Sequence, residues 1–322
     1  MAGPGRAAKL ATYALLVTDV VVIHYPSQRA ANWELLRRAA RALGVRLITW
    51  EPHRVQLSIS DSSVEARYDG RAVNPEILLH RTVSPFQGLI TPAIRHWSTA
   101  GTVVLNDIEA SFRARDKLLT TLALRDASVP VVPTIAIDEP DEETLADIDQ
   151  GDLVLKPAHG VRGEGIEAFA NAKAMAYAWG LYGTRSRRRA SPGYHIVREH
   201  YLAQPLVNGG GTDLRAFVVD GSCVALMRRR ARPGEFRANL ELGASAEPLP
   251  LHHPATVTAV AALRACGLDY GGVDLIEDEQ GTIRVLEVDA WAGFAGITAA
   301  TGVDVAQTIL SLALHRASGA HR

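Results

Sequence analysis

The sequence predicts an α/β protein whose C-terminal part is α+β. Short apolar runs alternate with helical patterns over about the first 105 residues, which is typical of a small parallel sheet covered by helices. From about residue 196 the apolar runs come in neighbouring pairs, which is typical of antiparallel hairpins. A chain of 322 residues is long enough for about two or three domains. We therefore expect an N-terminal domain over 1–105, a central unit over 106–195 and a C-terminal unit over 196–322.

The N-terminal part alternates strands with helices. Apolar runs predict strands at 12–17, 45–50, 76–82 and 102–106. Helical periodicity predicts one helix over "QRAANWELLRRAARALG", which ends at Gly44, and another over "PFQGLITPAIRHWSTAG". Because helices separate these strands, we expect the strands to pair in parallel.

The central part begins with a predicted helix over 109–126, which ends before the proline-rich "VPVVPT". The pattern then predicts a strand at "TIAI", an acidic helix at "DEETLADI" and a strand at "LVLKP". A glycine-rich loop, a strand at "IEAFA" and a helix at "NAKAMAYAWGLYG" follow, and the basic stretch "TRSRRRASPG" comes next.

In the C-terminal part, "LRAFVVDGSCVALMRR" places two apolar arms around Asp220 and Gly221, which is a strong hairpin signal. We then expect a helix at "ATVTAVAALRACG", strands at "GGVDLIED" and "TIRVLEVD", and a last helix from about residue 303.

The composition favours a globular protein with no general attraction to nucleic acid or membranes, because 47% of residues are apolar and the net charge is −1. No apolar run approaches the roughly 18 residues of a membrane span, and the first residues lack the apolar core of a secretory signal. The two cysteines, Cys223 and Cys266, give no disulfide framework. We therefore expect a cytoplasmic location.

Lys156 ends the apolar run "LVLK" and is followed by the glycine-rich "PAHGVRGEG". Glycine lets backbone N–H groups approach phosphate oxygens, and the ammonium group supplies positive charge, so this segment suits phosphate binding. The loop is neither a Walker A sequence nor a dinucleotide fingerprint. A flexible hairpin with a solvated lysine is the alternative.

Three carboxylates stand in apolar surroundings near the C-terminus. Glu287 and Asp289 in "LEVDAWAGF" are two residues apart, so in a strand they point to the same face. Asp274 lies in "GGVDL", which is expected to pair with that strand. Oxygen-only ligands suit a hard cation such as magnesium. Carboxylates at a solvated sheet edge are the alternative.

A basic stretch at 228–243 offers guanidinium groups that can bind phosphate or carboxylate in a bidentate way. Because Pro233 and Gly234 predict a loop, these groups are expected to converge. A solvated run of charges is the alternative reading. The relevant side chains are Arg228, Arg229, Arg230, Arg232, Arg237 and Asn239.

Taken in order, Lys117, Lys156, "AQPLVNGGGTDLR", "RRARPGEFRANL", "GGVDL" and "LEVDAWAGFAGI" resemble the ATP-grasp ligases, and especially the branch similar to the ribosomal-protein-S6 glutamate ligase, called RimK-like. The resemblance covers about residues 105–315. It implies an ATP-grasp fold preceded by a small parallel-sheet pre-ATP-grasp domain.

The resemblance also implies roles for individual residues. Lys117 and Lys156 would contact the phosphates of ATP, and the backbone of Gln204, Pro205 and Leu206 would contact adenine. Further nucleotide-side residues would be Asp213, Arg237 and Asn239. The magnesium or manganese ligands would be Asp274, Glu287 and Asp289. Arg215 and Arg229 would face the acyl phosphate and the acceptor.

Three positions depart from the usual pattern of this family. Pro205 stands where the family usually carries Glu, Asp289 where it carries Asn, and Ala292 where it carries Pro. None of them removes a phosphate-binding lysine or a metal ligand, so we expect an active enzyme.

The implied reaction joins a carboxylate to an amine through an acyl phosphate, with ATP consumed to ADP. The expected partners are an amino acid such as glutamate, a peptide, or a carrier or substrate protein, and a homo-oligomer is compatible with the sequence. A carrier-dependent or natural-product ligase and a nucleotide-binding regulator without turnover stay open. RNA binding by "RSRRR" is disfavoured because no aromatic side chains are interleaved there.

Overall fold

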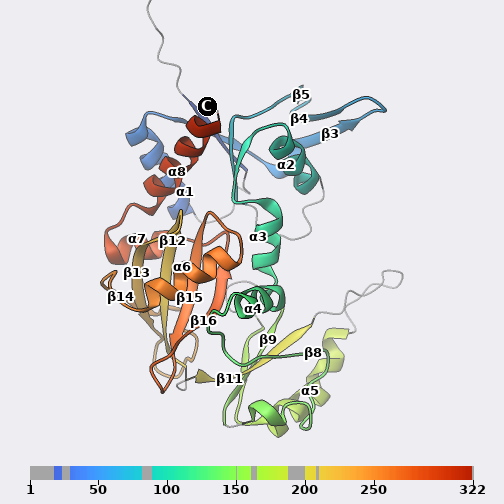
Figure 1. Ribbon diagram of the computed structural model, residues 1–322. Helices are drawn as coiled ribbons and strands as arrows, with labels where there is room; N and C mark the ends of the chain where they lie inside the picture. Colours follow the sequence, from blue (N-terminus) through green and yellow to red (C-terminus); the bar gives the residue numbers. More distant parts are fainter. Residues whose placement is uncertain are drawn as a thin grey trace, which may run out of the picture.

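The computed structural model describes residues 18–23, 30–81, 89–149, 151–160, 165–187, 200–207 and 210–320. The strand expected at 12–17, residues 161–164 of the glycine-rich loop and most of the basic stretch at 184–193 lie outside the described residues. Within them the chain forms three lobes (Figure 1).

The N-terminal lobe contains a parallel sheet, as the alternation of strands and helices predicts. Its strand order is β2-β1-β6-β7. The strands are β2 (Arg46–Trp50), β1 (Asp19–Ile23), β6 (Ile77–His80) and β7 (Val103–Leu105), and the helices are α1 (Ala30–Leu43) and α2 (Ile90–Thr99). The order changes direction between β1 and β6, and open α/β sheets bind ligands outside the carboxyl ends of strands at such a point.

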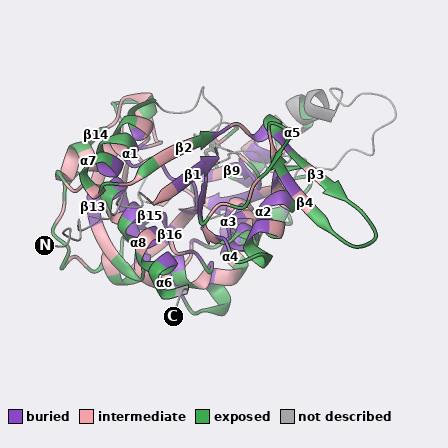
Figure 2. Ribbon diagram, turned by 90° about the horizontal axis from the view of Figure 1, so that it is seen from above, coloured by how far each residue is buried: buried purple, intermediate pink, exposed green. Residues whose placement is uncertain are grey.

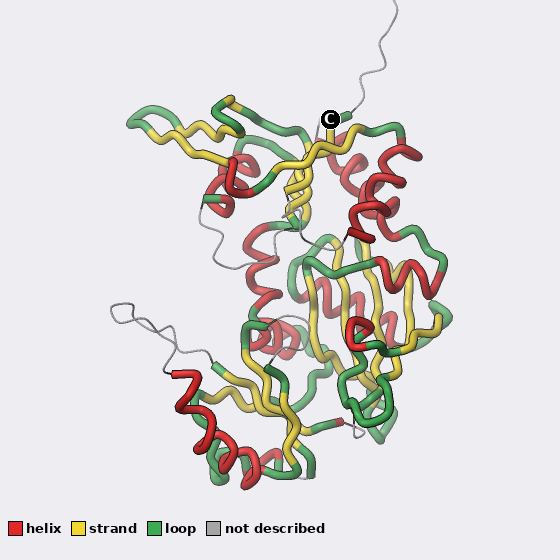
Figure 3. The backbone as a smooth tube through the Cα atoms, turned by 180° about the vertical axis from the view of Figure 1, so that it is seen from behind, coloured by secondary structure: helices red, strands yellow, loops and turns green. Residues whose placement is uncertain are grey.

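A second, antiparallel sheet extends from this lobe, and the sequence analysis made no prediction for it. After the 3-10 turn η1 (Pro52–Arg54), it consists of β3 (Val55–Ile59), β4 (Val64–Tyr68) and β5 (Arg71–Ala72). The β3–β4 ribbon projects away from the body of the molecule (Figure 3), and most of its residues are exposed (Figure 2).

The single helix expected over 109–126 is wrong, because the segment forms two helices, α3 (Ile108–Arg115) and α4 (Lys117–Asp126). Asp116 between them is extended, with φ −85° and ψ 112°, and its carboxylate accepts hydrogen bonds from the N–H groups of Leu118 and Leu119. An aspartate cap of this kind starts a new helix. The bend places Arg115 and Lys117 on either side of the cap.

The central lobe is built on an antiparallel sheet of order β10-β9-β11-β8, with α5 (Ala172–Arg187) packed against it. The strands are β8 (Ile135–Ile137), β9 (Leu153–Pro157), β10 (Glu167–Phe169) and β11 (Tyr201–Pro205). The helix expected at "DEETLADI" is wrong, since only a 3-10 turn forms there, η2 (Ala146–Ile148). One turn is enough to bury its two apolar residues, Leu145 and Ile148.

The C-terminal lobe is a five-stranded antiparallel sheet of order β14-β13-β12-β15-β16. The predicted hairpin is confirmed, and Asp220 and Gly221 have φ of 47° and 72°, as a type I′ turn requires. The strands are β12 (Thr212–Val219), β13 (Ser222–Arg230), β14 (Ser245–Pro248), β15 (Tyr270–Glu277) and β16 (Ile283–Asp289). The remaining elements are η4 (Leu240–Leu242), α6 (Ala255–Ala265), α7 (Ala295–Thr301) and α8 (Val305–Ala320).

The strand pairing bears on the division into units. β11 pairs with β8 and β9 of the central sheet. We therefore propose that the C-terminal unit begins after Pro205, later than the boundary at 195/196 that the sequence pattern suggests.

The N-terminal and C-terminal lobes share a core. Residues of β1, β6 and β7 and of α1 pack in one buried cluster with Ile309, Leu310 and Ala313 of α8. Figure 1 shows α8 beside α1.

The same two lobes are also joined by the buried side chain of Asn106, which follows β7. Its amide NH₂ donates to the backbone oxygens of Tyr270 and Ala290, and its oxygen accepts from the N–H groups of Asp269 and Tyr270. The side chain is 1% exposed. Every donor and acceptor of the amide is thereby used.

Across the part of the chain that the structure describes, no single helix is long and apolar enough to cross a membrane. Only α7 and α8 taken together reach that length and composition, and they are bent by 114°.

We expect Asn106→Ala to lower the free energy of unfolding by about 3–5 kcal/mol, because it leaves several buried backbone groups without a partner. Urea denaturation followed by circular dichroism measures this. The matched control is Asn171→Ala on the exposed start of α5, which removes one helix-capping hydrogen bond and should cost about 1 kcal/mol. Equal losses in the two variants would contradict a bridging role for Asn106.

Candidate active site

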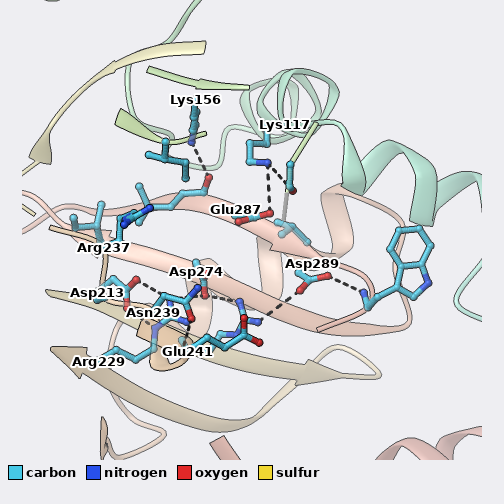
Figure 4. A pocket seen from close by; sticks show the side chains of 18 of the residues that line it. Lys117, Lys156, Asp213, Arg229, Arg237, Asn239, Glu241, Asp274, Glu287 and Asp289 are labelled. Carbon is cyan, nitrogen blue, oxygen red and sulfur yellow. Dashed lines mark hydrogen bonds and ion pairs between the residues drawn. The ribbon is translucent and has the colours of Figure 1, made fainter. Parts of the chain in front are cut away.

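A cavity of about 320 Å³ lies where the three lobes meet. All the residues to which the family resemblance assigns a role line this cavity, and they come from α4, β9, β11, β12, β13, β15, β16 and the segments after β11 and β13. Figure 4 shows Lys117 and Lys156 on one side of the cavity, with Asp213, Asp274 and Arg229 on the other. The structure thus brings together residues that are more than 170 positions apart in the sequence.

The two lysines lie on the side of the cavity that the central lobe forms, and both are almost fully buried. Lys117 opens α4, and its Nζ lies 3.2 Å from the backbone oxygen of Gly160 and 3.9 Å from Oε1 of Glu287. Lys156 on β9 donates a long hydrogen bond of 3.5 Å to the backbone oxygen of Leu286. Both ammonium groups therefore lie near the same stretch of β16.

The pKa of Lys156 is lowered to about 8, mainly by burial; the carboxylate of Glu287 opposes this shift and the positive charge of Lys117 adds to it. Burial raises the pKa of Glu287, against the effect of Lys117. Each group is thus shifted toward its neutral form in the free protein, and a polyanionic ligand would restore the charge of the lysine.

The three predicted metal ligands lie on one face of the C-terminal sheet. Asp274 on β15 is opposite Glu287 on β16, and Gly272 is opposite Asp289. Since side chains alternate along a strand, Asp274, Glu287 and Asp289 point to the same side. This is the cavity side, which all three line.

Two arginines on neighbouring strands neutralise part of this face. Arg215 on β12 donates to Asp274 at 2.6 Å and lies 3.7 Å from Asp289. Arg229 on β13 makes a bidentate pair with Asp213, with both contacts at 2.6 Å, and lies 3.1 Å from Asp274. Burial alone would raise the pKa of Asp274, but the two guanidinium groups outweigh burial and hold it below its usual value.

Gly272 explains how Arg215 can lie across β15. A Cβ atom at this position would lie 2.8 Å from Cζ of Arg215 and 2.8 Å from Cβ of Ala292. The glycine in "GGVDL" is therefore required by close packing of the guanidinium group against the strand.

The fit of these carboxylates to a metal ion is partial. Among the described residues, no group of three or more His, Cys, Asp and Glu side chains is arranged to hold a metal ion. The carboxylate of Asp274 is paired with Arg215 and Arg229. The donor chemistry of Glu287 and Asp289 fits magnesium, whereas Asp274 fits only if it shares its oxygens with the guanidinium groups.

The expected convergence of the arginine-rich stretch is wrong for part of it. Arg228 and Arg230 pair with Glu247 on the sheet surface, while Arg229 between them points into the cavity. The three lie on a strand, in which successive side chains alternate between faces. Arg232 contacts the backbone oxygen of Gly243, and Arg237 lines the cavity while paired with Glu235.

The segment expected to face adenine lines the cavity from Gln204 to Leu206. The side chain of Gln204 donates to Thr134 Oγ1 at 2.8 Å, and the N–H of Leu206 donates to the oxygen of Asp152 at 2.7 Å. Of the three residues, Pro205 therefore has no N–H to offer, and the N–H of Leu206 is already bonded within the protein.

Comparison with known proteins places this geometry in a family. The model of the RimK-like ATP-grasp domain matches residues 114–313. The chain belongs to the RimK-like ATP-grasp family. It is an ATP-grasp ligase, and its class of reaction is ATP-dependent formation of an amide bond.

Relatives of this ligase cover most of its length. A protein of Thioalkalivibrio sulfidiphilus named "Probable alpha-L-glutamate ligase" is 34% identical over 86% of this chain and 89% of its own. A protein of the same name from Alkalilimnicola ehrlichii is 32% identical over 90% and 93%.

Solved structures share the fold. The ATP-grasp ligase PsnB, complexed with a minimal precursor, gives a TM-score of 0.69 at 22% identity and covers 94% of this chain and 100% of its own. D-alanyl-alanine synthetase A from Vibrio cholerae gives 0.66 at 14% identity, over 95% and 100%. The expected ATP-grasp architecture is thereby confirmed.

The structure adds cavity residues of the ligase that the sequence analysis did not identify. They are contributed mainly by the N-terminal lobe and by the bend before α4, and include Asn32, Trp33, Arg81, Arg115 and Trp291. Arg115 stands two residues before Lys117 in "RARDKLL", so its position beside a predicted phosphate-binding lysine was the available signal.

When a nucleotide binds to the ligase at pH 8 or above, the protein should take up protons. Phosphate favours the ammonium form of Lys156, whose pKa is about 8 in the free protein, so about half a proton should be bound per nucleotide at pH 8 and nearly one at pH 9. Calorimetry with an ATP analogue in two buffers of different ionisation enthalpy measures the uptake. Lys156→Arg keeps its charge throughout, and uptake by that variant equal to wild type would show that another group titrates.

The same shift affects stability in the free protein. Since the unfolded chain binds more protons than the folded one between pH 8 and 10.5, the contribution of Lys156 to the free energy of unfolding rises with pH across that window.

Proposed function

We propose that this ligase uses ATP to join L-glutamate to the amine or carboxylate of a second substrate, which is an amino acid, a peptide or a protein-bound group. The observation that carries the proposal is the pair of buried lysines that face a carboxylate and arginine surface across one cavity. The names of the relatives at 30–34% identity support glutamate as the substrate.

The nucleotide end is assigned to the central lobe. Lys117 and Lys156 would hold phosphate oxygens, since an ammonium group at the end of a buried strand offsets phosphate charge. Carbonyl oxygens between Gln204 and Leu206 suit the amino group of adenine. Asp213, Arg237 and Asn239 line the same cavity and are assigned to the nucleotide side.

Glu287 and Asp289 would hold magnesium or manganese, with Asp274 sharing its carboxylate between the ion and the two arginines. The ion would offset negative charge on the transferring phosphoryl group. PsnB, which shares the fold, has been solved with Mg and ADP.

Arg215 and Arg229 are assigned to the reacting groups. In the first step a carboxylate oxygen of the substrate attacks the γ-phosphorus, and ADP leaves. In the second step the amine nitrogen attacks the carbonyl carbon of the acyl phosphate, phosphate leaves, and the amine loses a proton. A guanidinium group held in place by Asp213 or Asp274 is preorganised to stabilise the oxyanion or the departing phosphate. A cytoplasmic location stays a prediction.

Lys156→Ala should lower ATP turnover by about 100-fold, because the loss of one fixed charge at a developing phosphoryl charge costs roughly 3 kcal/mol. ADP release with L-glutamate, alone and with other amino acids, peptides or carrier proteins, is the measurement. Lys173→Ala on the exposed face of α5 is the control and should keep full activity. Nucleotide binding without ADP release under every condition would favour the regulator.

Asp289→Asn should stay active but require more magnesium for half-maximal rate, whereas Asp289→Ala should lose most activity. The amide oxygen can still accept from the N–H of Trp291, as the carboxylate does at 2.9 Å, so the following loop is kept while the attraction for the ion falls. The rate at fixed ATP is measured against magnesium concentration. Asp126→Asn on the exposed end of α4 is the control. Unchanged magnesium dependence in both Asp289 variants would remove this residue from the metal site.

A further inference from the structure

Arg115 differs from the other arginines of the cavity because its guanidinium group has no hydrogen-bond or ion-pair partner among the described residues. Its Nε is buried and has no acceptor, and its Cζ lies 5.8 Å from the ring centre of Trp291. Arg215, Arg229 and Arg237 are each paired with a carboxylate. The side chain lines the cavity, so its cationic group is presented to whatever binds there.

The acidic residues nearest to this arginine do not pair with it. Glu287 and Asp289 influence it through space, but Glu287 lies beside Lys117 and Asp289 beside Arg215. Burial lowers the pKa of Arg115, which records the cost of holding a cation there without an acceptor. Packing alone does not require a cation here, since an apolar side chain over Trp291 would fill the place without the cost of burying a charge.

The Trp291 ring against which Arg115 lies is held in place by hydrogen bonds. Trp291 beneath it donates through Nε1 to His80, and its backbone oxygen accepts from Nη2 of Arg81. Arg81 follows β6, at the carboxyl edge of the parallel sheet and beside the β1–β6 change of order. Ligands of open α/β sheets bind at this edge. The place therefore belongs to the N-terminal side of the cavity, away from Gln204 to Leu206 of the central lobe.

We infer that Arg115, laid over the Trp291 ring, binds a carboxylate of the amino-acid substrate that does not itself react. The planar fork of a guanidinium group matches a carboxylate in a bidentate way. This inference rests on the proposed function and makes it more specific. If the amino acid supplies the activated carboxylate, it must carry a second one. If it supplies the attacking amine, it must carry a free carboxylate. Arg81 acts as a positioning residue that fixes the Trp291 backbone.

The test compares Arg115→Gln and Arg115→Lys with wild type, and Arg113→Gln is the control on the same helix because Arg113 is exposed and lies outside the cavity. The affinity for L-glutamate is measured by calorimetry in the presence of magnesium and a non-hydrolysable ATP analogue. Arg115→Gln should bind glutamate about 10- to 100-fold more weakly, with the affinity for the analogue kept. Arg115→Lys should recover part of the loss, because it keeps the charge but not the fork.

A second readout separates recognition from structure. A purely structural arginine stabilises the free protein, so its removal lowers the melting temperature. Because Arg115 has no acceptor among the residues that the structure describes, Arg115→Gln should melt at the same temperature as wild type or higher. In addition, the two monoamides of glutamate should bind wild type with different affinities, and Arg115→Gln should lose this preference.

Equal glutamate affinity in wild type and Arg115→Gln would overturn the inference, and a loss confined to the ATP analogue would place Arg115 on the nucleotide side instead. If wild type does not bind glutamate at all, the proposed substrate fails, and the inference is then tested with succinate and glutarate. Binding of either dicarboxylate that depends on Arg115 would uphold the carboxylate subsite, and no such dependence would overturn it.

Discussion

The buried amide of Asn106 fixes the relation between the N-terminal sheet and the strands that carry the acidic residues of the site. It donates to the backbone oxygens of Tyr270 and Ala290 and accepts from the N–H groups of Asp269 and Tyr270. A second amide also joins the N-terminal lobe to this region, since Oδ1 of Asn32 accepts hydrogen bonds from the N–H groups of Phe294 and Ala295. The segment that follows Asp289 is therefore held by side chains of the N-terminal lobe, which makes that lobe part of the site.

The cavity is lined by groups of opposite charge, and the acidic groups are paired more completely than the basic ones. Asp213 and Asp274 are matched to Arg229 and Arg215 at hydrogen-bonding distance, whereas Lys156 makes only one long contact and Arg115 makes none with a described acceptor. Buried cations without anions are costly. In the free enzyme the poorly paired cations lie where anionic ligands are expected, so a bound anionic ligand would supply the missing negative charge.

The sequence predicted the strands of the three larger sheets better than it predicted the segments between them. Strong apolar runs such as "LVLKP" and the turn at Asp220–Gly221 are local signals, and the corresponding strands formed where expected. The break at Asp116 was missed because a helical pattern runs through it, and only the cap reveals the new helix. The exposed ribbon of β3 and β4 lacks an apolar run, so its pairing left little trace in the sequence.

The site shows the same division between local and distant information. Lys117, Lys156 and the three carboxylates lie in recognisable motifs, and all of them reach one cavity. The pairing of Arg215 with Asp274 and the isolation of Arg115 depend on strand register and on side chains from other lobes, which one sequence does not encode in any short segment. For the same reason the whole arginine-rich stretch was expected to converge, although strand alternation turns Arg228 and Arg230 toward Glu247.

The packing of α8 against α1 also bears on the order in which the chain can fold during synthesis. The first strands and α1 leave the ribosome long before residues 305–320, yet Ile309, Leu310 and Ala313 belong to the same buried cluster as Val20 and Leu36. Contacts so distant in sequence form late and slowly. The N-terminal lobe must therefore keep an apolar face uncovered until the rest of the chain has been made, which is the period when such a surface is exposed to chaperones and to aggregation.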